Sequence, residues 1–526
     1  MDRVRHKRNY ALHSWIGVTL GLFVYLISIS GCFALFFGEI RNWENPDLRA
    51  SFSEPLIPMN DRIMEWTSEI TEPEHIRSLS VSVPTQQLPY FQARVRYETS
   101  DGETDSKVQR WIASDGQRLD EREEGLAQWI LGIHRYLMWP NELGGNQIGR
   151  GLSGIAGVVM LLSIITGIIA HTKISKEMFA LRFHRSVRLK WQDTHKVLGL
   201  WTAPFSILMS LTGAITGIVV IFAPVLVLLI AHGDMGRVVE AMGQERIDRS
   251  GVPAEMMSID DMIAIAKFEH EGTLTSLDYA QWGDQNARVT MNFKSADQLK
   301  LNDPIVYGAV LTETPASFPA TESPTGFRLS NGAYPLHYGN YGGIALKLLY
   351  FVLGLAMSIV VILGIMMWLE RRIHGNEGSR SVGFYRGLSR LTVGVGVGIP
   401  LATIAVFHSD KLLYASTGSS LEGVGWVYFL AIIGSIIFAF IRSNEYCASR
   451  ELTGVLGALS VLAPISNMAV TGDVFLFDLF DPVITYAWVD IFFLIVGFAC
   501  MLVAWKMPSH RKEPKKVNFE PAPELL

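Results

Sequence analysis

The sequence predicts a polytopic α-helical membrane protein with eight transmembrane helices and both termini on the cytoplasmic side. Three observations support this fold class: eight long apolar runs, Lys and Arg gathered on one side of those runs, and an internal repeat. The repeat predicts two copies of a span–α+β domain–span unit, followed by a block of four C-terminal helices. Charged residues make up 18% of the 526 residues, against about 25% in a soluble domain. A soluble cytoplasmic enzyme is therefore excluded.

The eight apolar runs contain 17 to 34 residues each, and their only charged residues are Lys347 and Asp490. About 20 residues at a rise of 1.5 Å cover a hydrocarbon core of about 30 Å. The runs cover residues 11–37, 151–171, 197–230, 344–369, 391–407, 424–441, 452–471 and 483–505. The first follows a basic stretch but is too long for a signal peptide, so we expect a retained anchor.

The positions of Lys and Arg predict the orientation of the spans. The N-terminus is basic, the loop 172–194 carries six Lys or Arg residues, and the loop 370–390 carries five. Basic residues also follow the sixth and eighth runs, whereas the loop 472–482 holds three Asp and no Lys or Arg. All basic segments lie on one side of the membrane if eight spans have both termini inside.

The two long polar segments, 39–150 and 232–343, are predicted to be copies of one α+β unit. In each, an amphipathic helix precedes three strand-like runs. The first unit has a helix at 59–70 and strands at 76–83, 91–98 and 107–113. The second has a helix at 259–269 and strands at 273–281, 287–293 and 304–311.

The apolar runs beside these units repeat as well. His13 and Gly17 open the first run, His195 and Gly199 open the third, and each His is followed eighteen residues later by Gly31 or Gly213. Residues 1–175 and 190–375 therefore form two parallel repeats. The predicted divisions are the first helix (1–38), outer domain 1 (39–150), helices 2 and 3 with their cytoplasmic loop (151–231), outer domain 2 (232–343), helix 4 with its cytoplasmic loop (344–388), helices 5–8 (389–506) and a cytoplasmic tail (507–526).

Four histidines occupy matched positions in the two repeats. His13 and His195 lie near the inner face, and His134 and His337 directly precede the second and fourth runs at the outer face. Metal-binding side chains inside a bilayer are costly and therefore mark functional sites. Two pairs, one at each face, suit two six-coordinate haems with imidazole on both sides of each iron. Gly17 and Gly199, and four further glycines, are expected to clear space for the macrocycles: Gly31, Gly167, Gly213 and Gly364.

His171 and His374 also match across the repeats and are a rival inner pair. We favour His13 and His195 because they lie within apolar runs, whereas His171 and His374 lie beside Lys173 and Arg371. Asp490, within the last run, is interpreted as a hydrogen-bonding partner for a neighbouring helix.

Several other chemistries are not supported. The net charge of −5 argues against a nucleic-acid binder, and the three cysteines provide no disulfide framework or iron–sulfur spacing. The sequence contains no Walker A loop and no GxGxxG motif after a predicted strand. No HExxH or Ser-His-Asp pattern is visible. The residues alone therefore predict a two-haem transmembrane electron conduit.

Four short motifs over residues 1–375 resemble the PepSY-associated transmembrane family, and in particular its inner-membrane ferric-siderophore reductases. The motifs are His13-x-x-x-Gly17, Leu131-x-x-His134-Arg135, His195-Lys-Val-Leu-Gly199 and His337-x-Gly339. The resemblance implies a multi-pass protein of the bacterial inner membrane with two periplasmic PepSY-like domains. It implies two b-type haems, ligated by His13, His195, His134 and His337, and reduction of a periplasmic ferric siderophore to release Fe(II).

The expected partners are a ferric siderophore, the lipid bilayer and a cytoplasmic or membrane electron donor, with no nucleic acid. We expect Arg135 to hold a haem propionate and reduction to occur at the outer face, beside Tyr338 and Tyr341. Two alternative functions remain open. One is an iron or siderophore transporter without redox activity, and the other is a sensor whose PepSY-like domains bind a peptide or peptidase.

Overall fold

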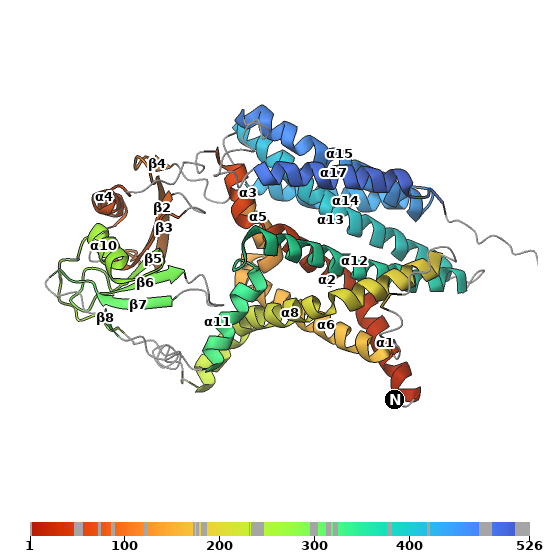
Figure 1. Cartoon of the computed structure of the whole chain (residues 1–526), viewed down its shortest axis with the longest axis horizontal. Helices are drawn as coiled ribbons and strands as arrows, with labels where there is room; N and C mark the ends of the chain where they lie inside the picture. Colours follow the sequence, from red (N-terminus) through yellow and green to blue (C-terminus); the bar gives the residue numbers. More distant parts are fainter. Residues whose placement is uncertain are drawn as a thin grey trace, which may run out of the picture.

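The computed structural model of the chain consists of a bundle of long helices with a β-sheet at one end (Figure 1). The structure describes residues 3–46, 56–71, 75–85, 90–119, 125–171, 174, 178–179, 187–230, 232, 247–294, 303–311, 317–318, 325–375, 381–417, 421–472 and 487–510. Most of the loop 172–186, the acidic segment 473–481 and the basic tail after residue 510 lie outside the described residues.

The two predicted repeats are present as two similar runs of elements. The first comprises α1 (Arg3–Thr19), α2 (Gly21–Ala34), α3 (Phe37–Glu44), α4 (Asn60–Ile70), β1 (Ile76–Ser82), β2 (Tyr90–Glu98), β3 (Thr104–Ile112), β4 (Arg118–Leu119), α5 (Leu126–Tyr136) and α6 (Gly145–Ala170). The second comprises α8 (Val187–Ile230), α10 (Ile259–Glu269), β5 (Thr273–Ala280), β6 (Arg288–Lys294), β7 (Asp303–Gly308), β8 (Ser317–Phe318), α11 (Thr325–Tyr338) and α12 (Gly343–Gly375).

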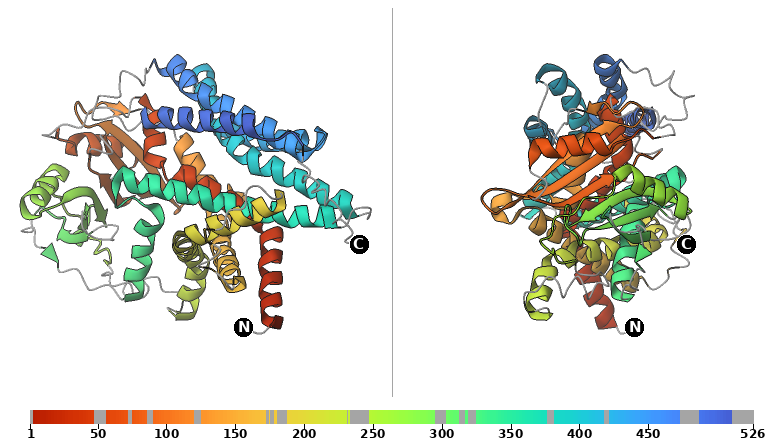
Figure 2. Two further views of the ribbon diagram at one scale, coloured as in Figure 1. Left: turned by 45° about the vertical axis from the view of Figure 1, so that its right-hand side comes forward. Right: turned by 90° about the vertical axis from the view of Figure 1, so that its left-hand side faces the viewer.

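The C-terminal block has no β-strand in its described residues and lies along one side of the bundle (Figures 1 and 2). Its helices are α13 (Ser381–Thr417), α14 (Leu421–Ile441), α15 (Glu445–Thr471) and α17 (Ala487–Lys506). Among the described residues, seven helices are long and apolar enough to cross a membrane, or eight if the bent pair α1 and α2 forms one span. The protein is therefore a multi-pass membrane protein.

The first span differs from its counterpart in the second repeat. It bends by 65° between α1 and α2, whereas α8 continues as one helix. The bend occurs at Leu20, directly before Gly21. A Cβ atom at Gly21 would lie 2.9 Å from Ile365 on α12, so the glycine allows α2 to approach α12 closely after the bend.

The two predicted α+β units share a single antiparallel sheet. Its strand order is β4-β3-β2-β1-β5-β6-β7-β8, so the two halves meet where β1 pairs with β5. Leu79, Val81 and Leu277 point into a core that is covered by α4 and α10. Trp66 of α4 meets Trp111 of β3 edge to face at 5.7 Å in the same core. The two outer domains expected from the sequence therefore fold as one joint unit.

Two short helices differ from the sequence-based expectation. Residues 126–136 and 325–338 belong to the polar segments that were assigned to the outer domains, yet they form α5 and α11. α5 packs against α2, α3 and α6, and α11 packs against α8. Each therefore joins the helical bundle rather than the sheet, and each carries one of the four matched histidines.

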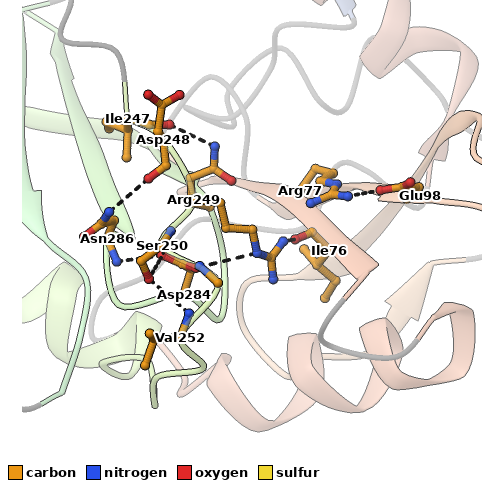
Figure 3. Close-up of polar contacts among 12 residues, drawn as sticks. Ile76, Arg77, Glu98, Ile247, Asp248, Arg249, Ser250, Val252, Asp284 and Asn286 are labelled. Atoms are coloured by element: carbon orange, nitrogen blue, oxygen red, sulfur yellow. Dashed lines mark hydrogen bonds and ion pairs between the residues drawn. The ribbon is translucent and has the colours of Figure 1, made fainter.

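A buried carboxylate organises the contact between the two halves of the sheet. Asp284 is 1% exposed and accepts hydrogen bonds from the backbone N–H groups of Ser250 (3.0 Å) and Gly251 (2.8 Å) and from the hydroxyl of Ser250 (2.9 Å). Arg249 lies 3.7 Å from this carboxylate and 3.5 Å from the carbonyl of Ile76 in the first half (Figure 3). The second half is thereby linked to β1 by polar contacts as well as by strand pairing.

The variant Asp284→Ala should destabilise the sheet by about 1–3 kcal/mol, because it leaves buried N–H donors without an acceptor. Burial opposes ionisation of this carboxyl, but the hydrogen bonds from Asn286, Ser250 and Gly251 outweigh it and hold the pKa below its usual value. The difference in stability between wild type and Asp284→Ala should therefore be complete above about pH 4 and disappear as the pH falls through the lowered pKa. Thermal unfolding of the detergent-solubilised protein at several pH values measures both effects. A difference that persists unchanged at low pH would contradict this role of the carboxylate.

Candidate metal centres

The four matched histidines form two facing pairs. The ring centres of His13 and His195 are 6.1 Å apart with the planes inclined at 62°. The ring centres of His134 and His337 are also 6.1 Å apart, with the planes within 19° of parallel. Each pair combines one histidine from each repeat, as the sequence predicted.

One ring nitrogen of each histidine is occupied by a hydrogen bond. Nδ1 of His13 lies 2.9 Å from the carbonyl of Ser163, and Nδ1 of His195 lies 2.8 Å from the carbonyl of Val360. Nδ1 of His134 lies 3.0 Å from the carbonyl of Ile27. A carbonyl can only accept, so Nδ1 must carry the proton in these three rings. The neutral ring then has an unprotonated Nε2, which is the form that binds a metal.

The fourth histidine follows a variant of this pattern. Nδ1 of His337 lies 2.9 Å from the hydroxyl of Thr212. In the first repeat, the hydroxyl of Ser30 occupies the equivalent position, 3.4 Å from Nδ1 of His134. Among the described residues, Nε2 has no hydrogen-bond partner in any of the four rings. All four rings are thus held through Nδ1.

Four glycines make these contacts possible, one facing each histidine. A Cβ atom would lie 2.8 to 3.1 Å from the nearest ring atom, in the pairs Gly31–His134, Gly167–His13, Gly213–His337 and Gly364–His195. For three of them, the carbonyl that binds Nδ1 is four residues earlier on the same helix. A side chain at the glycine would cover that carbonyl, because helical side chains lean toward the N-terminus.

These four glycines were expected to clear space for a macrocycle, and the structure shows a different use. Each clears space for the imidazole ring itself. An added Cβ at Gly17 would meet nothing within 4 Å, and one at Gly199 would meet only a methyl group of Val360 at 3.7 Å, so the expected role of these two glycines stays a prediction. The sequence shows that Gly31 and Gly213 follow His13 and His195 by eighteen residues. This spacing could not reveal which group each glycine contacts.

The inner pair lies beside a cavity of about 1210 Å³. His13, His195, Gly17 and Gly199 line it, together with three basic residues, Lys196, Arg371 and Arg372. His171 and His374 line the same cavity, and His374 lies 3.5 Å from the carboxylate of Glu370. The rival pair is therefore close to the site but has an acidic partner of its own.

The residues of both pairs fit a haem. A ring nitrogen binds a first-row metal at about 2 Å, so two imidazoles on opposite sides of one metal have centres roughly 6 Å apart. Both pairs have a separation of 6.1 Å. The described residues contain no group of three or more His, Cys, Asp or Glu that would hold a bare metal ion. Two imidazoles could hold a metal only with a further set of ligands, and a porphyrin would supply one.

Arg135, expected to bind a propionate, lies with its guanidinium 5.1 Å from the ring centre of Tyr136. It is next in sequence to His134 on α5, and its role toward a ligand stays a prediction. The ring centre of Tyr338 lies 6.1 Å from that of His337, and Tyr338 and Tyr341 are 37% and 41% exposed.

Comparison with known proteins supplies the family. Residues 10–371 match the model of the PepSY-associated TM region. The chain belongs to this family. It is also 24% identical over 343 residues to a protein of Pseudomonas aeruginosa named "Uncharacterized protein PA4219", an alignment that covers 61% of this chain and 83% of that protein. The PepSY-associated TM region contains all four matched histidines and their four glycines and ends before α13.

The glycine contacts predict which substitutions disturb each centre. Gly364→Ala should displace His195 at a cost of about 1–3 kcal/mol, because the added Cβ would lie 3.0 Å from its Cε1 atom. Gly31→Ala should displace His134 in the same way. Gly434→Ala is the control, since nothing lies within 4 Å of its added Cβ on α14. Thermal unfolding and haem content of the three variants test this prediction, which fails if Gly364→Ala resembles Gly434→Ala.

Proposed function

We propose that this protein is an inner-membrane di-haem oxidoreductase that moves electrons across the membrane to reduce a periplasmic ferric siderophore and release Fe(II). The observation that carries the proposal is the geometry of the two histidine pairs. Both have ring centres 6.1 Å apart, and all four rings are anchored through Nδ1.

In this proposal His13 and His195 hold one haem, and His134 and His337 hold the other. A bound haem supplies a one-electron carrier whose potential depends on its axial ligands. Hydrogen bonds from Nδ1, to helix carbonyls in His13, His134 and His195 and to the hydroxyl of Thr212 in His337, hold each ring in one orientation and raise the basicity of Nε2. Three basic residues that line the inner cavity are proposed to pair with propionates: Lys196, Arg371 and Arg372. Arg135 is proposed for the same task at the outer pair.

The separation of the pairs supports transfer across a membrane. His195 and Gly213, which faces His337, are both on α8 and eighteen residues apart. At 1.5 Å per residue this is about 27 Å, close to the thickness of a hydrocarbon core. With the cytoplasmic termini that the basic residues predict, His13 and His195 are on the side of the electron donor and the sheet lies in the periplasm.

The substrate step requires only electron transfer. One electron converts Fe(III) of the bound chelate to Fe(II), and a cytoplasmic or membrane donor replaces it through the inner pair. Fe(II) is held less tightly by hard oxygen ligands, so the siderophore releases it. No protein group has to form a bond or move a proton. The exposed rings of Tyr338 and Tyr341 offer a place for the chelate beside the outer pair.

The two alternative functions make different demands on the histidines. A transporter without redox activity would leave the four anchored rings without a metal. It would continue to take up iron or siderophore when the four histidines are replaced. A sensor for a peptide or peptidase would use the sheet alone. The family and the sheet are compatible with both alternatives, so the decision depends on bound haem and its reaction.

Replacing His134 with Ala should remove one of two haems and leave the other reducible by dithionite, because the pairs are far apart. The purified protein should show low-spin b-type bands at about two haems per chain, and the variant about one. When reduced protein is mixed with a ferric hydroxamate and an Fe(II) chelator, Fe(II) release should be at least tenfold slower in the variant. A colourless wild-type protein would refute the proposed function, and unchanged Fe(II) release would move the substrate site elsewhere.

The double variant His171→Ala/His374→Ala should keep both haems, because His13 and His195 already provide a facing pair at the required separation. His13→Ala is the matched comparison and should lose the inner haem alone. Visible spectra and haem content per chain decide between the pairs. Loss of the inner haem from the double variant, with His13→Ala unaffected, would reverse the assignment of inner ligands.

A further inference from the structure

We infer that the four C-terminal helices position α5, the short helix that carries His134. The inference rests on the proposed function in that His134 is taken as a haem ligand. It assigns a role to helices α13–α17, which lie outside the matched family region. Three contacts connect the C-terminal block to α5 through α3.

The first contact caps α5. Glu44, the last residue of α3, is 5% exposed, and its carboxylate accepts a hydrogen bond of 3.1 Å from the backbone N–H of Ala127. The N-cap residue Gly125 has no side chain to do this, and any Cβ there would overlap the Glu44 carboxylate. A carboxylate at the N-terminus of a helix satisfies an unpaired donor and is favoured by the helix dipole. Glu44 thus fixes where α5 begins.

The second contact holds the C-terminal end of α3. Lys411 of α13 is 2% exposed, and its ammonium donates to the carbonyls of Trp43 (3.0 Å) and Glu44 (3.3 Å). The same ammonium lies 4.3 Å from the ring centre of Trp43. The last carbonyls of a helix lack partners within the helix and attract a cation. Lys411 therefore fixes the backbone of the residue that caps α5.

The third contact fixes the side chain of Trp43. Its indole N–H donates a hydrogen bond of 2.8 Å to Asp490 of α17, and the other carboxylate oxygen of Asp490 accepts one of 3.2 Å from Asn467 of α15. Trp43, Asn467 and Asp490 are all at most 1% exposed. Polar groups buried this deeply are costly unless they are paired, so these two hydrogen bonds favour a single arrangement of the three side chains. Three of the four C-terminal helices thereby contact α3 directly or through Asp490.

Beside its contacts with α2, α3 and α6, α5 also makes apolar contacts with the same block. Trp129 meets Tyr428 of α14 edge to face at 5.0 Å. Ile130 and Ile133, one turn from His134, belong to a buried cluster with Phe407 of α13 and Phe493 of α17. α5 has only eleven residues, and a helix of that length depends on tertiary contacts for its stability. The equivalent helix of the second repeat, α11, packs on α8 in the same way as α5 packs on α2.

The test uses Trp43→Phe, which keeps the ring and removes the hydrogen bond to Asp490, and Lys411→Met, which removes the cation. Hydrogen exchange of residues 126–136 should become about tenfold faster in each variant, while exchange in α12 stays unchanged. The midpoint potential or absorption bands of the outer haem should shift, and those of the inner haem should not. Lys411→Arg should restore both readouts toward wild type.

Ser460→Ala is the matched control, because Ser460 is fully buried in α15 but bonds only the carbonyl of Leu456 on its own helix. It should leave α5 and both haems unchanged. Unchanged exchange of α5 in Trp43→Phe and Lys411→Met would overturn the inference, as would faster exchange with an unaltered outer haem. A wild-type protein without haem would refute the proposed function instead, and the exchange data would still show whether the block holds α5.

Discussion

Burying an imidazole in an apolar bundle without satisfying its nitrogens is costly, and this constraint organises the centre of the structure. Each of the four histidines has a hydrogen bond at one ring nitrogen, Nδ1. In three of them the partner is a helix carbonyl that a glycine leaves uncovered. The glycine, the carbonyl four residues before it and the histidine on another helix then form one unit. The close packing of the helices at these units depends on the glycines, because a side chain larger than hydrogen at Gly31 or Gly364 would displace the histidine ring.

Much of the fold follows from periodicity that a single sequence displays. The helix 259–269 and the neighbouring strands were predictable because alternation and turn residues act over short distances. The joining of the halves through β1 and β5 was not, since an edge strand carries no local sign of its partner. α5 and α11 were missed for a related reason. They are 11 and 14 residues long, and their burial is caused by helices distant in the sequence.

The candidate site was predictable to the level of residue pairs. His13 and His195, and His134 and His337, were matched through the repeat, and the structure brings the members of each pair together. The partners of Nδ1 could not be predicted, because backbone carbonyls have no residue-type signature. Asp490 was expected to bond a neighbouring helix. That Trp43, almost 450 residues earlier, is one of its partners depends on tertiary structure alone.

The continuous sheet and the cross-repeat pairing of histidines have an evolutionary consequence. Strand order is symmetric about the contact of β1 with β5, and each candidate metal centre takes one histidine from either side of that axis. A chain with one repeat would carry half of each centre and an open edge at β1. It would be complete only as a twofold dimer, in which two copies pair those edges and share both centres. Gene duplication and fusion of such a dimer would yield the arrangement seen here. The two halves would then be free to diverge, and they already differ in their first spans: α1 and α2 meet at a bend, whereas α8 is one continuous helix.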